Sequence, residues 1–168
     1  TLNKNNTNFE IINLKGHTLA SIGILTKDGV LFAGDLLVGE EVLNKYDFLF
    51  LQDVEEYLKS LDKIQSLDFN YLVLAHGRKV LDKDSTMLLI NKHRQAIYKY
   101  LNQIKENLKV PMNIDALLKK IIKENELTYN YKEYYFFRTS LVTCISYLAD
   151  LDEIDYTLED SDLLYYTK

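Results

Sequence analysis

The chain has a single cysteine, Cys144, so it cannot form an internal disulfide bond, and this predicts a reducing compartment such as the cytoplasm. The sequence contains no apolar run near the ~20 residues that a membrane helix needs, and no charged-then-apolar start typical of secretion. The net charge of −5 provides no overall attraction for nucleic acid. These absences favour a soluble cytoplasmic protein that does not enter a membrane.

Proline is equally scarce, and the rest of the composition is ordinary for a globular domain: 47% of the 168 residues are apolar and 27% are charged. The polar residues 1–8 have little means of packing, which predicts a linker or the cut edge of a longer protein. Residues 9–90 show short apolar runs with a helical segment between them, whereas residues 91–168 are almost entirely helical in pattern. The sequence therefore predicts an α/β part followed by a small helical part.

In the first part, turn signals separate the expected strands. Residues 8–14 are predicted as a strand, and "SIGIL" and "VLFAG" as a hairpin around Asp28-Gly29. Residues 53–67 place apolar side chains on one helical face, and residues 71–75 form a short apolar run typical of a buried strand.

In the second part, helix signals dominate. A long helix is expected to begin at Asp84 or Ser85 and to end before Pro111, the only proline. Asn113 can cap the next helix, a third is expected over residues 134–151, and the tail can form a hairpin around "EDSD".

Three apolar runs end on side chains that bind metals. His17 and His76 each lie beside a glycine, and Asp35 follows Gly34. In layered α/β folds, ligands bind beyond the carboxyl ends of strands, and a neighbouring glycine allows the backbone to turn sharply there. Imidazole and carboxylate suit zinc, iron or manganese. Spacing alone makes these residues only weak candidates for a metal site.

The letters around these positions resemble the later metal motifs of the metallo-β-lactamase superfamily. The segments "EIINLKGHTLASIGIL", "VLFAGDLL" and "LVLAHG" follow the order found in that family, which is a strand into Gly-His-Thr, a hairpin into Gly-Asp, a helix, and a strand into Gly-His-Gly. Many members have proline where this chain has Lys15, and glycine where it has Ala75. "INKHRQAIYKYLNQI" is similar to the start of a winged-helix-like tail in some members.

This resemblance implies a fold and a metal site. Residues 9–90 would be the C-terminal half of an αββα sandwich, and residues 91–168 a helical, winged-helix-like domain. His17 would bind the first metal, Asp35 would bridge two metals, and His76 would bind the second. The implied cofactor is one or two zinc ions in the intact protein, with iron or manganese as alternatives.

The family's His-x-His-x-Asp-His signature is absent from the sequence. The resemblance therefore implies a fragment of a hydrolase in which a metal-bound hydroxide attacks an ester, thioester, lactam or related bond of a small molecule. A zinc site usually has at least three protein ligands, so we expect this chain alone to bind metal weakly and to be inactive. The alternatives are a nuclease of the same superfamily and a non-enzymatic half-fold that serves dimerisation or partner binding.

Half of a sandwich would expose the inner face of its sheet. Leaving ~500 Å² of apolar surface open forfeits about 12 kcal/mol, which is comparable with the stability of a whole domain. We therefore expect either the missing N-terminal half or a second copy of the chain to cover this face.

Two other features have a structural and a functional interpretation. His93 falls on an apolar helical stripe, which favours a packed histidine over a metal ligand, and Cys144 falls on an inward face, which favours a core residue over a nucleophile. The six aromatics in residues 129–138 can form core or stack on nucleic-acid bases, and the core interpretation is favoured. Nucleic acid is therefore a possible but disfavoured partner.

Overall fold

The computed structural model describes residues 2–4, 7–45, 49–76 and 79–168. Two compact units make up the chain: one contains Thr1–Lys45 and Glu55–Gln95, and the other contains Tyr46–Val54 and Ala96–Lys168. Within the described residues, every helix falls short of the length or apolarity that a bilayer requires. The two units are described separately below.

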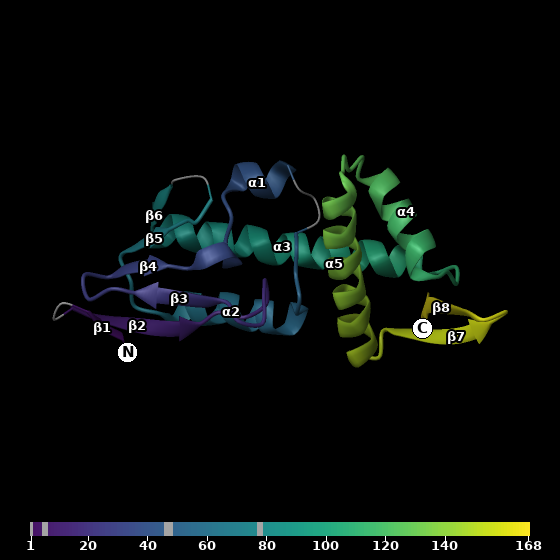
Figure 1. Ribbon diagram of the computed structural model, residues 1–168, viewed down its shortest axis with the longest axis horizontal. Coiled ribbons are helices and arrows are strands. Elements are labelled where there is room, and N and C mark those ends of the chain that lie inside the picture. The colour runs from purple at the N-terminus through teal and green to yellow at the C-terminus, as the bar shows by residue number, and fades with distance from the viewer. Residues whose placement is uncertain (1, 5–6, 46–48, 77–78) are drawn as a thin grey trace. The chain divides into compact units, whose positions relative to one another are not determined.

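The first unit is a mixed α/β layer (Figure 1). Its elements are β1 (Leu2–Lys4), β2 (Thr7–Asn13), β3 (Ile22–Leu25), β4 (Val30–Phe32), the 3₁₀ turn η1 (Gly34–Leu36), α1 (Glu40–Lys45), α2 (Val54–Ser66), β5 (Tyr71–Val73), β6 (Val80–Asp82) and the start of α3 (Lys83–Asn107). The six strands form one sheet in the order β1-β2-β3-β4-β5-β6. The α/β class, the β3–β4 hairpin and a strand at β5 are confirmed, but within β5 only Leu72 is buried and Tyr71 is exposed.

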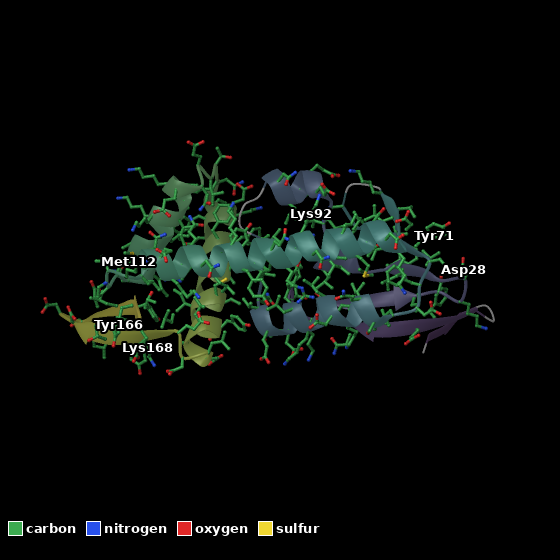
Figure 2. The ribbon with its side chains drawn as sticks, turned by 180° about the vertical axis from the view of Figure 1, so that it is seen from behind. Asp28, Tyr71, Lys92, Met112, Tyr166 and Lys168 are labelled. Carbon is green, nitrogen blue, oxygen red and sulfur yellow. The ribbon has the colours of Figure 1, made fainter. Side chains whose placement is uncertain are left out.

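The direction of the strands determines where the loops meet. β3 is antiparallel to both β2 and β4, and β4 is parallel to β5. β2, β4 and β5 therefore run in the same direction. The loops at their carboxyl ends lie together along the edge of the sheet that is formed by these strand ends. Asp28 and Tyr71, labelled in Figure 2, lie at the opposite edge, where β4 and β5 begin.

One face of this sheet is covered by helices. Seen from behind in Figure 2, α2 and α3 lie in front of the strands, and they lie behind the strands in Figure 1. Leu31 and Leu72 are neighbours on β4 and β5, and both are fully buried. From the helices, Leu61 and Ile90 are equally buried. Burial of this face fits the predicted apolar stripe of residues 53–67.

Two details near the strand ends differ from the sequence prediction. The prediction that the long helix begins at Asp84 or Ser85 is wrong, because the Asp82 carboxylate accepts the Ser85 N–H at 2.8 Å and α3 begins at Lys83. Leu2–Lys4 pairs with residues 7–9 as an edge strand, where the sequence predicts a polar linker. Asparagine and lysine suit an edge strand as well as a linker, so composition does not separate the two.

The second unit combines helices with a hairpin. It contains the end of α3, α4 (Ile114–Glu124), α5 (Tyr131–Asp150), β7 (Ile154–Glu159) and β8 (Asp162–Thr167). Asn113 caps α4 as predicted, and its side chain accepts the Ala116 N–H at 2.9 Å. The tail hairpin also forms as predicted, and Met112 bridges to Tyr165 on β8. α5 begins earlier than predicted, because Asn130 and Glu133 form a reciprocal capping box.

Candidate metal site

His17 lies in the loop between β2 and β3. Leu14 N–H donates to Ser21 O at 3.0 Å, which closes this loop at its base. Inside it, the Thr18 and Ser21 hydroxyls lie 2.7 Å apart. Gly16 adopts a φ of +127°, a conformation that L-residues with a side chain rarely adopt. The glycine before His17 is therefore required by the backbone of the loop.

Asp35 lies at the centre of η1, directly after β4. Gly34 has a φ of +58°, which turns the chain out of the strand and into the 3₁₀ turn. The two following residues, Leu36 and Leu37, are almost fully buried, and their packing in the core fixes the turn. The Asp35 carboxylate is 45% exposed, so it remains open to a ligand from solvent.

His76 lies just beyond β5. Leu74 N–H donates to Lys79 O at 3.1 Å, which closes the loop between β5 and β6. The His76 side chain is 65% exposed. Gly77, which completes the predicted motif, lies outside the described residues.

The three predicted residues meet at Asp35. His76 Nε2 lies 3.1 Å from Asp35 Oδ1, and His17 Nε2 lies 4.0 Å from Asp35 Oδ2. Each imidazole thus approaches a different carboxylate oxygen. Two ligands of a tetrahedral zinc ion, each ~2.1 Å from the metal, lie ~3.4 Å apart. The observed distances are on either side of this value, so each histidine could supply one ligand of an ion together with Asp35.

This set is too small for a complete site. Among the residues that the structure describes, no three His, Cys, Asp or Glu side chains are grouped closely enough to hold one ion. The arrangement gives two pairs that share Asp35, rather than one triad. A zinc site with at least three protein ligands would therefore need ligands from outside the described residues.

Tyr57 and His93 form a buried polar pair next to the Asp35 turn, which the sequence does not predict. The Tyr57 hydroxyl lies 2.6 Å from His93 Nδ1 and donates to Leu36 O at 2.9 Å. His93 Nε2 lies 3.0 Å from Val38 O. His93 is fully buried, which confirms that it packs in the core, and burial lowers its pKa. A tyrosine and a lone histidine on apolar helix faces were the only sequence signal for this pair.

Two other candidates are placed in the second unit. Cys144 is buried on α5, and burial raises the pKa of its thiol to about 12, which confirms it as a core residue. In the aromatic run, Phe137 is buried, whereas Tyr129, Tyr131, Tyr135 and Phe136 are exposed. The core interpretation is therefore confirmed for Phe137, Tyr134 is half-buried, and base stacking by the exposed aromatics stays the disfavoured alternative.

The chain is similar in sequence to a curated protein, although it matches no family model. A sequence match joins it to the β-lactamase-like protein 2 homolog of Drosophila melanogaster, with 25% identity over 123 residues that cover 70% of this chain and 40% of that protein.

Two crystal structures share the fold. A metallo-β-lactamase family protein from Thermus thermophilus superposes with a TM-score of 0.74 at 16% identity, covering 99% of this chain and 52% of the other. A β-lactamase domain protein from Burkholderia ambifaria gives 0.76 at 14% identity, with 99% and 50% covered. At these identities the structures show a shared fold.

In sequence the chain is similar to a β-lactamase-like protein, and it shares its fold with the two crystal structures. The chain spans about half the length of the relatives that it matches.

Proposed function

We propose that this chain supplies one half of the metal centre of a hydrolase, with His17, Asp35 and His76 as ligands. The observation that carries the proposal is the approach of two imidazoles to opposite oxygens of one carboxylate, at 3.1 and 4.0 Å. Asp35 would face both metal positions, with His17 at one and His76 at the other. The remaining ligands would come from a segment outside this sequence, since the described residues supply two donors per position.

Zinc is the metal that we propose, because imidazole and carboxylate donors at this spacing suit it. When bound, a divalent metal supplies a Lewis acid that activates water for attack on a carbonyl or phosphoryl centre. The chain's own contribution is to hold the donors at the sheet edge. Esters and thioesters are the proposed substrate class for the intact protein.

The sheet supports the proposal that this chain is the second half of a sandwich. Across five strands, the side chains opposite the helices form one apolar row in register: Ile11, Ile24, Phe32, Val73 and Val80. Phe32 is 43% exposed and Val80 is 64% exposed. A second sheet, supplied by an upstream segment, would bury this row. By the same resemblance, we propose that α4, α5 and the β7–β8 hairpin form a winged-helix-like domain.

Metal titration tests the site. We expect isothermal titration calorimetry to detect weak zinc binding by this chain, and much tighter binding by a longer protein that carries the upstream half. Asp35→Asn should abolish both, because one carboxylate serves both positions. Asp28→Asn removes a carboxylate from the opposite edge of the sheet and should change neither. Equal zinc affinity in the wild type and Asp35→Asn would contradict the site.

Activity assays test the reaction. The longer protein with zinc is expected to hydrolyse a thioester or ester faster than a β-lactam or an RNA oligonucleotide, and this chain alone is expected to hydrolyse none of them. Turnover of RNA alone would favour the nuclease alternative. Tight, zinc-independent association of the chain with itself, without turnover by the longer protein, would favour the non-enzymatic half-fold.

A further inference from the structure

We propose that Tyr57 is a positioning residue which, with His93, fixes the Asp35 turn relative to the His17 loop. The inference rests on the proposed metal site, but the contacts that support it are independent of any metal. They connect one helix, α2, to both loops that carry candidate ligands.

The first connection joins α2 to the His17 loop. An ideal Cβ at Gly16 would lie 2.3 Å from the Cα of Tyr57, so the loop backbone packs directly on the helix. One helical turn further on, the Ser60 hydroxyl donates to Lys15 O at 2.7 Å. The residues before His17 are therefore attached to α2 by close packing and by a hydrogen bond.

The second connection joins the same residue to the Asp35 turn. The Tyr57 hydroxyl donates to the carbonyl of Leu36, the residue after Asp35, at 2.9 Å. Tyr57 is 1% exposed, so water does not compete for this bond. Tyr57 thus contacts the residue before one candidate ligand with its backbone and the residue after another with its side chain.

His93 from α3 is the second partner of the Tyr57 hydroxyl, 2.6 Å from it. A tyrosine hydroxyl has one proton, and Tyr57 uses it on Leu36 O when His93 Nδ1–H donates to the Tyr57 oxygen. His93 Nε2 lies 3.3 Å from Val38 N and 3.0 Å from Val38 O, so it accepts the Val38 N–H in this tautomer and donates to Val38 O in the other. In either tautomer of neutral His93, the ring connects the Tyr57 hydroxyl to the backbone of Val38. The turn is therefore held on both sides of Leu37.

Such a network is expected to control metal affinity. Groups that orient metal ligands typically change affinity 10–100-fold when they are removed. Tyr57→Phe removes a single oxygen atom and leaves the packing against Gly16 in place. Ile64→Val is the matched control, because Ile64 is fully buried on the same helix and has no polar side-chain atom. Both variants weaken the core, but only Tyr57→Phe releases the Asp35 turn.

Two measurements on the full chain test the inference. The chain has three histidines, so NMR of the imidazole nitrogens resolves each one during a titration with Zn²⁺. We expect Tyr57→Phe to weaken zinc binding about tenfold at His17 and His76, and Ile64→Val to leave it unchanged. Without metal, amide hydrogen exchange at Leu36 and Val38 should be about tenfold faster in Tyr57→Phe than in Ile64→Val.

Three outcomes separate the inference from the proposed function. Zinc affinity and exchange that match those of Ile64→Val would overturn the positioning role of Tyr57. If the wild-type imidazole signals do not respond to Zn²⁺, the metal site fails, and the exchange rates still decide whether Tyr57 fixes the turn. Ser60→Ala is expected to perturb the His17 signals while leaving exchange at Val38 slow, because it releases only the His17 loop.

Discussion

Gly16 packs so closely on Tyr57 that a Cβ added to the glycine would lie 2.3 Å from the Tyr57 Cα. The nearest atoms are the Cα, Cβ and N of Tyr57, which no side-chain rotation can move away. The Gly16 φ of +127° would also strain any other residue. The glycine before His17 is therefore required both for its backbone conformation and for space.

We predict that Gly16→Ala lowers the free energy of unfolding by more than about 2 kcal/mol, because overpacking and backbone strain act at the same residue. Urea unfolding followed by circular dichroism measures the change. Gly39→Ala is the control, since its Cβ would meet the flexible carboxylate of Glu41, which can move aside. Equal, small losses in both variants would show that the loop can move away from α2.

The thiol of Cys144 should be inert in the native chain. Burial raises its pKa to about 12, so at pH 8 only about one thiol in 10⁴ is ionised, and the thiolate is the reactive form. We predict that iodoacetamide labels Cys144 only in denaturant. Because the chain has one cysteine, mass spectrometry gives its labelling directly. Complete labelling of the folded chain within minutes would mean that α5 opens readily.

The end of α4 offers a stabilising substitution. Glu126 is exposed and has a φ of +49°, the left-handed conformation in which a helix often ends on glycine. We predict that Glu126→Gly raises the free energy of unfolding by up to about 1 kcal/mol. Glu126→Ala removes the same charge but keeps a Cβ, so it should give no such gain. The difference between the two variants in urea unfolding isolates the backbone effect.

The sequence predicts the three candidate ligands, but it does not predict all of the strands and buried contacts around them. His17, Asp35 and His76 each follow a short apolar strand beside a glycine, and local patterns of this kind are visible in one dimension. β6, by contrast, was not predicted, because its apolar run is only Val80 and Leu81, with a charged residue on each side.

The pairing of Tyr57 with His93 could not be predicted either. Their hydrogen bond depends on the packing of α2 against α3, which no local pattern encodes. The sequence places each of these residues on an apolar face, and only the fold brings their polar atoms together.

His93 should make the stability of the chain depend on pH. Burial lowers the pKa of His93 in the folded chain below the usual 6.5. At a pH between 6.5 and this lower pKa, His93 is protonated in the unfolded chain and neutral in the folded chain. Stability rises with pH wherever the unfolded state holds more protons. The contribution of His93 is therefore complete above pH 6.5 and is lost as the pH falls through the pKa of the folded state.

We predict that, below pH 6.5, His93 alone makes the free energy of unfolding fall by up to about 1.4 kcal/mol for each pH unit. Comparing urea unfolding of the wild type and His93→Gln at several pH values isolates it, because carboxylates titrate in both. NMR of the native chain provides a second measurement that needs no variant. The His93 ring should stay neutral while the pH falls through 6.5, and a ring that protonates near 6.5 would mean that water reaches it in the folded state.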